Sequence, residues 1–200
     1  MSQAPERMLS VVIPTHESER DLVRTLAILV AGAAAGVVRE VIVADAGSRD
    51  ATAAVADYAG CRVLVSESSL GERLRAAAAT ARAPWLLFLN PGTLLDATWI
   101  DDTVRFIEGN GARAAAFRPG RAAATATATA TASLLGEALS LLWLALGGRP
   151  RPAQGLLIAK ELYDSIGGHH DGADAEADLL RRLGRRRIAM LRSAAMSARA

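Results

Sequence analysis

The sequence predicts an α/β fold in which a mostly parallel central sheet is flanked by helices. Short β-branched runs without a polar break, such as residues 41–44, are typical of strands buried on both faces of a sheet. These runs alternate with longer segments whose apolar residues recur at helical spacing, as Leu22, Leu26 and Leu29 do. Strands that alternate with helices form mostly parallel sheets with right-handed crossovers. The 200 residues are enough for one domain with a substantial core.

The expected elements alternate regularly as far as residue 117. The predicted strands cover residues 9–14, 41–45, 61–65, 85–89 and 113–117, and the predicted helices cover 19–30, 50–59, 71–82 and 96–108. After residue 119 we expect helices at 134–146, 160–166 and 174–183, and strands at 154–159 and 188–191. The Ala/Thr alternation at 122–132 indicates either a strand with all its threonines on one face or a linker.

Composition narrows the class of protein. The net charge of +2 is too small and too scattered to indicate a nucleic-acid partner. The single cysteine, Cys61, excludes an intramolecular disulfide and fits a reducing compartment. No signal peptide is recognisable, and the apolar stretch at 134–146 is shorter than the about 20 residues of a membrane span. We therefore expect a cytoplasmic protein without a transmembrane span, in which residues 134–146 form either a core helix or a helix at the inner face of the membrane.

The stretch at residues 40–52 has the pattern of a ligand site. Asp45 follows a buried strand directly, and Gly47 and Ser48 form a turn before a helix. Ligands of open α/β sheets bind at the carboxyl ends of the strands, where Asp45 offers an acceptor to a base or ribose. The alternative is that Asp45 and Ser48 only cap the turn and the helix. A dinucleotide fold is excluded, because residues 14–19 lack the Gly-x-Gly-x-x-Gly turn.

Four segments in order resemble the glycosyltransferases of family 2, which have the GT-A fold. They are residues 10–17, 41–52, 85–93 and 154–187. The nearest resemblance is to short bacterial transferases related to those of arsenosugar biosynthesis, although these continue with an apolar tail where this chain stops at Ala200. The resemblance implies one nucleotide-diphospho-sugar transferase-like domain over residues 1–200. Its nucleotide-sugar half is expected at 1–120, its low-complexity segment at 121–133, and its acceptor half at 134–200.

The resemblance also implies an activity, the transfer of a sugar from a nucleotide-diphosphate sugar to an acceptor hydroxyl. A UDP-sugar is the expected donor, and the acceptor is not specified by the sequence. The residues that match the family's nucleotide loop and turn are Pro14, Thr15, Glu17, Asp45, Gly47 and Ser48. For Glu17 the alternative is a residue in the first turn of a helix that interacts with the helix dipole.

The family's metal motif is altered in this chain. The family binds Mn²⁺ or Mg²⁺ through an aspartate after its fourth strand, but this chain has Gly92 at that position, between Asn90 and Thr93. Hard cations prefer carboxylate oxygens, and Asn90 and Thr93 offer only neutral ones. We therefore assign no metal ligand, and Mg²⁺ or Mn²⁺ binds only if the altered site still works. Pro91-Gly92 is also a turn dipeptide, and the vicinal histidines at 169–170 fit either a solvated loop or a metal site.

The acceptor side departs from the family pattern as well. Gln154 and Gly155 stand where the resemblance implies a Gly-Asp-Gln-Gly turn, and Glu176 stands at the position of the general base. Asp174 is the second candidate for the base, and the alternative for both carboxylates is the cap of a helix N-terminus. The lost carboxylates leave two hypotheses. The chain is either a glycosyltransferase with an altered site or a catalytically impaired module that binds a nucleotide or a protein partner.

Overall fold

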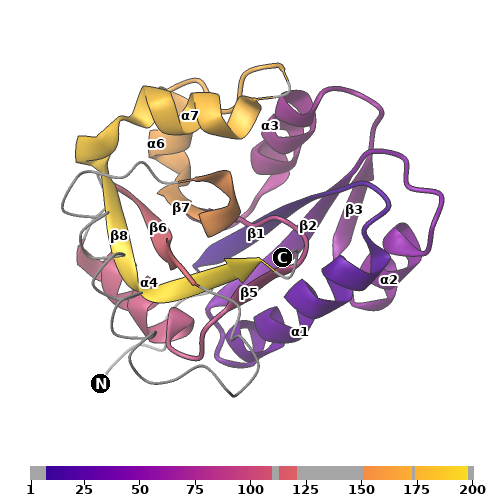
Figure 1. Ribbon diagram of the computed structural model, residues 1–200, viewed down its shortest axis with the longest axis horizontal. Coiled ribbons are helices and arrows are strands. Elements are labelled where there is room, and N and C mark those ends of the chain that lie inside the picture. The colour runs from indigo at the N-terminus through magenta and orange to yellow at the C-terminus, as the bar shows by residue number, and fades with distance from the viewer. Residues whose placement is uncertain (1–7, 110–112, 121–150, 173, 198–200) are drawn as a thin grey trace, which may run out of the picture.

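A single curved sheet is the centre of the computed structural model, which describes residues 8–109, 113–120, 151–172 and 174–197 (Figure 1). Within these residues the strand order is β3-β2-β1-β4-β7-β6-β8-β5. The strands are β1 (Leu9–Thr15), β2 (Val38–Asp45), β3 (Arg62–Val65), β4 (Trp85–Phe88), β5 (Thr93–Leu95), β6 (Ala114–Pro119), β7 (Leu156–Ala159) and β8 (Ile188–Ser197). Four of the strand pairings are parallel and three are antiparallel, so the predicted fold class, a mostly parallel sheet flanked by helices, is confirmed.

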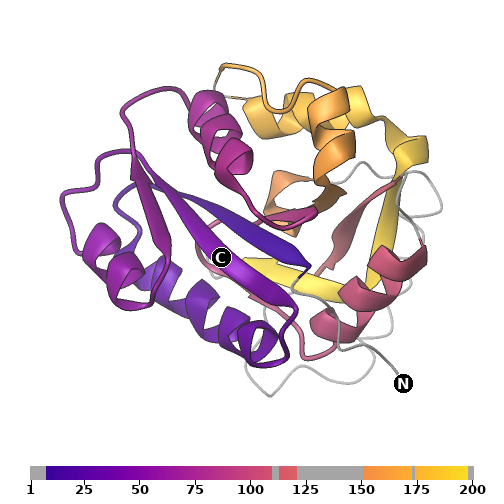
Figure 2. The same cartoon turned by 180° about the vertical axis from the view of Figure 1, so that it is seen from behind.

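Helices cover both faces of the sheet (Figures 1 and 2). The helices are α1 (Glu19–Ala34), α2 (Thr52–Tyr58), α3 (Leu70–Thr80), α4 (Trp99–Gly109), α6 (Lys160–Ser165) and α7 (Ala175–Leu183), with single 3-10 turns η1 (Pro152–Gln154) and η2 (Arg185–Arg187). The core cluster on one face takes residues from α1, α2 and α4, and the cluster on the other face takes residues from α3, α6 and α7. Successive residues of β1 alternate between them, because Val11 and Ile13 pack on one face and Val12 on the other.

The topology brings separate segments to one edge of the sheet. β2, β1 and β4 are parallel neighbours, so their carboxyl ends lie side by side. β7 runs antiparallel to β4 with Leu156 opposite Phe88, which places the amino end of β7 at that same edge. As a result, Asp45, Asn90 and Gly155 belong to one edge although they are far apart in the sequence.

The observed elements differ from the expected ones mainly at their ends. β2 begins at Val38 rather than at residue 41, and β8 continues to Ser197 instead of ending at 191. β5 was not predicted, because three residues are too few to show a period. Residues 154–155 are not in a strand, since Pro152 starts a 3-10 turn and Gly155 has a positive φ of 71°.

Two expectations lie outside the described residues, namely the Ala/Thr segment at 122–132 and the helix at 134–146. Within the described part of the chain, no helix is both long enough and apolar enough to cross a bilayer.

Candidate functional site

Asp45 is the most heavily hydrogen-bonded group at the site edge. Its residue is 1% exposed. Its Oδ1 accepts the hydroxyls of Thr15 (2.7 Å) and Ser48 (2.6 Å), and its Oδ2 accepts the amides of Gly47 (3.0 Å) and Ser48 (2.7 Å). Burial raises the pKa of this carboxyl, but the hydrogen bonds from Ser48, Thr15 and Gly47 outweigh it and hold the pKa below the usual 3.8. Asp45 is therefore ionised at neutral pH and fixes the turn.

These four bonds bear on the two interpretations of Asp45. A carboxylate has about four lone-pair sites, and all of them are occupied by groups of the protein. Asp45 thus holds the turn, as the capping interpretation requires. A base or ribose that bonded to it would replace the hydroxyl of Thr15 or Ser48, and this contact stays a prediction.

The turn after β2 also holds the loop between β1 and α1. Three successive amides of this loop donate to side chains of the turn: Glu17 to Ser48 Oγ (2.9 Å), Ser18 to Thr52 Oγ1 (2.9 Å) and Glu19 to Asp50 Oδ2 (3.2 Å). The N-cap residue Ser18 makes no side-chain cap to α1. The hydrogen bonds from the amides of Ser18 and Glu19 therefore satisfy two donors at the start of this helix with side chains of another segment. The two loops therefore form one unit.

Glu17 lies in this loop and not in the helix. It is exposed and has a positive φ of 48°, which is uncommon for a residue with a side chain. Its Oε1 accepts the amide of Arg49 at 2.6 Å, which ties it to the β2 turn. Because α1 begins at Glu19, the interpretation of Glu17 as a first-turn residue is wrong. Thr15 and Pro14 beside it are buried.

Arg73 of α3 is a site residue that sequence reasoning did not assign. Its Nη1 donates to the carbonyls of Ala44 (2.7 Å) and Thr15 (3.3 Å), and its Nε donates to the carbonyl of Ser68 (3.3 Å). Burial lowers the pKa of Arg73, and the charge of Asp45 opposes that change. The guanidinium thus ties the ends of β1 and β2 together, a role that no sequence period reveals.

The segment after β4 forms a tight turn. The amide of Thr93 donates to the carbonyl of Asn90 (3.1 Å), with Pro91 second and Gly92 third at a positive φ of 83°. The amide of Gly92 donates to the carbonyl of Asp21 (3.1 Å) and also contacts the hydroxyl of Thr25 (3.0 Å). A Cβ at position 92 would lie 3.3 Å from Asp21 Cγ, so this position faces α1.

The residues of this turn do not fit a protein-bound Mg²⁺ or Mn²⁺. Asn90 offers a neutral amide, Thr93 is buried, and Gly92 has no side chain. In the described ranges no three His, Cys, Asp or Glu side chains are grouped closely enough to hold a metal ion. A divalent cation needs several oxygen ligands, usually with carboxylates among them.

Glu176 reaches the same turn from the first turn of α7. It is half-buried, and burial raises the pKa of its carboxyl, while a hydrogen bond with the Asn90 side chain opposes the rise. A carboxylate with a raised pKa is a better base near neutral pH. Asp174 is exposed and makes no side-chain cap bond to α7, so the cap interpretation does not hold for it.

A small cavity lies beside Glu176. It leaves about 10 Å³ for the centre of a water-sized sphere, which is about the room that one water needs. Phe88, Gly155 and His169 line it together with Glu176, and the exposed Arg151 borders it. The cavity therefore joins the end of β4, the start of β7 and the start of α7.

Gln154 and Gly155 shape this region from within. The Gln154 side chain donates to the carbonyl of Phe117 (2.8 Å) and accepts the amide of Arg151 (2.6 Å). A Cβ at Gly155 would lie 2.8 Å from Leu89 Cδ2. Both residues hold the start of β7 in place, and a contact with an acceptor molecule stays a prediction.

The two vicinal histidines have different environments, so neither a shared solvated loop nor a shared metal site describes them. His169 is 1% exposed, its Nδ1 lies 2.9 Å from Tyr163 Oη, and its amide donates to that oxygen at 3.1 Å. Burial is the main cause that lowers the pKa of His169 to about 3 and raises the pKa of Tyr163 to about 12. His170 is exposed, with Nδ1 3.3 Å from Asp178 Oδ2.

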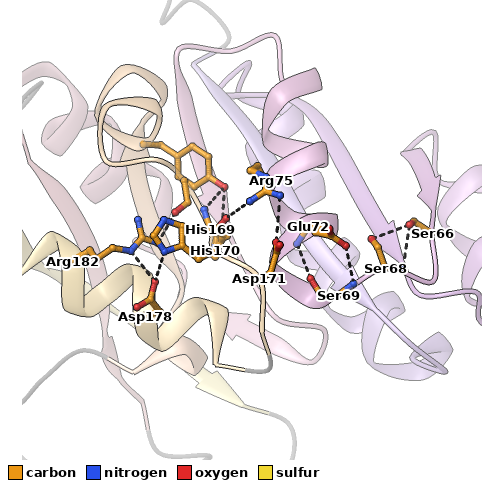
Figure 3. A network of polar contacts seen from close by, with 12 residues as sticks. Ser66, Ser68, Ser69, Glu72, Arg75, His169, His170, Asp171, Asp178 and Arg182 are labelled. Atoms are coloured by element: carbon orange, nitrogen blue, oxygen red, sulfur yellow. Dashed lines mark hydrogen bonds and ion pairs between the residues drawn. The ribbon is translucent and has the colours of Figure 1, made fainter.

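Two arginines hold the loop that carries these histidines (Figure 3). Arg182 of α7 donates to the carbonyls of Ile166 and Gly168, both at 2.6 Å, and to Asp178 at 2.7 Å. Arg75 of α3 donates to the carbonyl of His169 (3.1 Å) and to Asp171 (3.3 Å). The loop is thus held from both α3 and α7.

Comparison with known families supplies the classification. The model of a family described as glycosyl transferase family 2 matches residues 10–151, which is more than half of the chain. The chain belongs to glycosyl transferase family 2. The match includes the Asp45 turn and the turn at Pro91-Gly92, and it ends before Glu176. The resemblance to the arsenosugar-related subgroup stays a prediction.

Solved structures agree on the fold. Glucosyl-3-phosphoglycerate synthase from Mycobacterium tuberculosis, in complex with Mn²⁺, UDP and glucosyl-3-phosphoglycerate, is 23% identical with a TM-score of 0.66. The same enzyme in complex with UDP is 24% identical with a TM-score of 0.67. Each match covers 92% of this chain and 69% of the other. A comparison with curated proteins gave no significant match. At this identity the likeness shows that the GT-A fold is shared.

Proposed function

We propose that this family 2 protein transfers a sugar from a nucleoside-diphosphate sugar to an acceptor hydroxyl. The observation that carries the proposal is that the loop clamped by the Asp45 turn and the Glu176 carboxylate belong to segments at one edge of the sheet. The fold is shared with an enzyme whose crystal structures hold UDP and UDP-glucose, which supports a uridine nucleotide as donor. A cytoplasmic location, with or without contact at the inner membrane face, belongs to the same proposal.

Each side of the edge has one role in this proposal. The loop of Thr15 and Glu17 binds the nucleotide, and the Asp45 turn keeps that loop in place. Glu176 accepts the proton of the acceptor hydroxyl while the hydroxyl oxygen attacks the anomeric carbon. The bond from that carbon to the diphosphate breaks, and the nucleoside diphosphate leaves with the electron pair. Because the turn at Gly92 supplies no metal carboxylate, we expect slow transfer.

The test is turnover with a panel of nucleoside-diphosphate sugars and hydroxyl acceptors, with EDTA and with Mn²⁺. We expect release of a nucleoside diphosphate, detected by chromatography. Glu176→Gln should lower turnover by about 10²–10⁴, the usual span for a general base. Asp174→Asn is the matched control, because Asp174 is exposed on the same helix end, and its turnover should stay within about twofold. Equal turnover in Glu176→Gln and the natural protein would remove Glu176 from the mechanism.

A binding module without turnover is the second candidate, and the altered turn at Gly92 is the observation that favours it. Melting curves with nucleoside diphosphates separate the two candidates. Ligand at a hundredfold over its dissociation constant adds about 2.7 kcal/mol of stability. A shift of the melting temperature without turnover would support the binding module. If no nucleotide shifts the curve and no sugar is transferred, both candidates are wrong.

A further inference from the structure

The contact between Tyr163 and His169 bears on which ring nitrogen of His169 carries the proton. The Tyr163 hydroxyl oxygen accepts the amide N–H of His169 at 3.1 Å. Its own proton has His169 Nδ1 within reach, at 2.9 Å from the hydroxyl oxygen, and the relay assigns Nδ1 as its acceptor. An imidazole nitrogen that accepts a hydrogen bond carries no proton, so the proton of the neutral ring is on Nε2.

The ring is held rigidly in this orientation. It packs edge-on against Phe88 with ring centroids 4.8 Å apart and an interplanar angle of 75°. The backbone around it is fixed by Arg75 on the His169 carbonyl and by Arg182 on the Gly168 carbonyl (Figure 3). Burial keeps the imidazole neutral, because the pKa of His169 is lowered to about 3. The ring therefore keeps one orientation and stays neutral across physiological pH, so the Nε2–H remains a donor that points in one direction.

The Nε2–H lacks a partner within the described residues, since the hydrogen bonds of His169 there run through Nδ1, the amide and the carbonyl. His169 lines the cavity beside Glu176, and this cavity has room for about one water. A hydrogen-bond donor at the wall of a cavity of this size favours an oxygen atom there as its partner.

We propose that Tyr163 and His169 form a fixed relay whose Nε2–H holds one hydroxyl-sized oxygen in the cavity beside Glu176. In the free protein this oxygen is a water. During transfer it is the acceptor hydroxyl, and this second part rests on the proposed function. The oxygen accepts from Nε2–H and donates its proton to Glu176, and one lone pair stays free to attack the sugar. Tyr163 is then a positioning residue that acts through His169.

Nitrogen-15 NMR of the imidazole tests the relay without any substrate. In the natural protein we expect the Nε2–H tautomer at every pH from about 5 to 8, with cross-relaxation from this proton to a bound water. Tyr163→Phe keeps the ring packing but removes the hydroxyl, and we expect a mixture of the two tautomers. An Nδ1–H tautomer in the natural protein would overturn the relay, as would titration of His169 near its ordinary pKa of 6.5.

Two substitutions at His169 test its role in transfer. His169→Gln keeps an N–H donor, while His169→Phe keeps a planar ring without one. With saturating donor sugar, we expect kcat/KM for the acceptor to fall at least tenfold in His169→Phe and to recover largely in His169→Gln. The KM for the donor should stay within about twofold in both. Equal losses in the two variants would reduce His169 to a packing residue and overturn the proposal.

The NMR experiment and the kinetic experiment distinguish a failure of the relay from a failure of the proposed function. If the natural protein transfers no sugar but holds the water on Nε2–H, the proposed function fails and the relay in the free protein stands. If the Nε2 proton of the natural protein shows no cross-relaxation to a water, the relay is wrong whatever the turnover. Melting curves of each variant confirm that it is folded before either arm is measured.

Discussion

The two sides of the site edge differ in how many hydrogen bonds their carboxylates accept and in the direction in which the pKa of each carboxylate is shifted. On the side of β1 and β2, the buried carboxylate of Asp45 has four donors, and its pKa is lowered. On the side of β7 and α7, Glu176 has a raised pKa and a hydrogen bond with the side chain of Asn90. Arginines that bond to backbone carbonyls, with Arg182 as the main example, fix the surrounding loop. A fully satisfied carboxylate is suited to hold a frame, whereas a poorly satisfied one remains available to accept a proton.

The largest effect is expected where the two sides meet. A Cβ at Gly71 of α3 would overlap the carbonyl oxygen of His170, which belongs to backbone that cannot yield easily. We expect Gly71→Ala to destabilise the protein by about 3 kcal/mol, since overpacking of a filled contact costs about 1–3 kcal/mol or more. Urea denaturation measures the loss, and hydrogen exchange should rise over residues 166–172.

Gly109→Ala is the matched control for this substitution. Gly109 also lies near one end of a helix, as the last residue of α4, and within the described residues its Cβ would meet no atom of another segment within 4 Å. We expect no loss of stability there. Equal stability of the Gly71→Ala and Gly109→Ala variants would mean that the α3 contact does not join the two sides.

The second largest effect is expected when the carboxylate of Asp45 is replaced by the neutral amide of asparagine. Asp45→Asn would place an amide NH₂ or a single oxygen against two N–H donors and two hydroxyls. We expect a loss of about 2–3 kcal/mol at pH 7. Because the folded-state pKa of Asp45 is lowered, its contribution is present above the ordinary value of 3.8 and is lost as pH falls toward the folded value.

The measurement is the free energy of unfolding of both proteins between about pH 7 and pH 3, from urea denaturation. The difference between the Asp45→Asn variant and the natural protein should shrink at the acid end. A difference that stays constant over this range would show that the charge of Asp45 does not hold the turn.

The smallest effect concerns the altered metal turn. Gly92→Asp places a side chain at a positive φ of 83° and directs it at Asp21, whereas Gly36→Asp meets a similar φ of 74° in open space. Strain should cost each variant about 1 kcal/mol, and repulsion from Asp21 should add a further fraction in Gly92→Asp. Isothermal titration with UDP should give the same affinity with EDTA and with Mn²⁺ in Gly92→Asp. Tightening by Mn²⁺ of tenfold or more would show that position 92 can aim a carboxylate at the nucleotide.

The sequence by itself determined the alternation of strands and helices, the turn at Asp45 and the turn at Pro91-Gly92. These features depend on residues close together in the chain, where apolar period, proline geometry and glycine freedom act locally. The family also followed from short segments in a fixed order.

Only the tertiary structure decided which polar groups are buried, which partners they have and in which direction their pKa values shift. Glu176 of α7 contacts Asn90 after β4, and Arg75 and Arg182 bond to the carbonyls of His169 and Gly168, so these contacts join residues that are far apart in the sequence. Arg73 joins β1 and β2 in the same way. Every residue has a backbone carbonyl, so the sequence does not show which carbonyls accept hydrogen bonds from arginines. An arginine that binds carbonyls therefore cannot be distinguished from a solvated arginine by sequence alone.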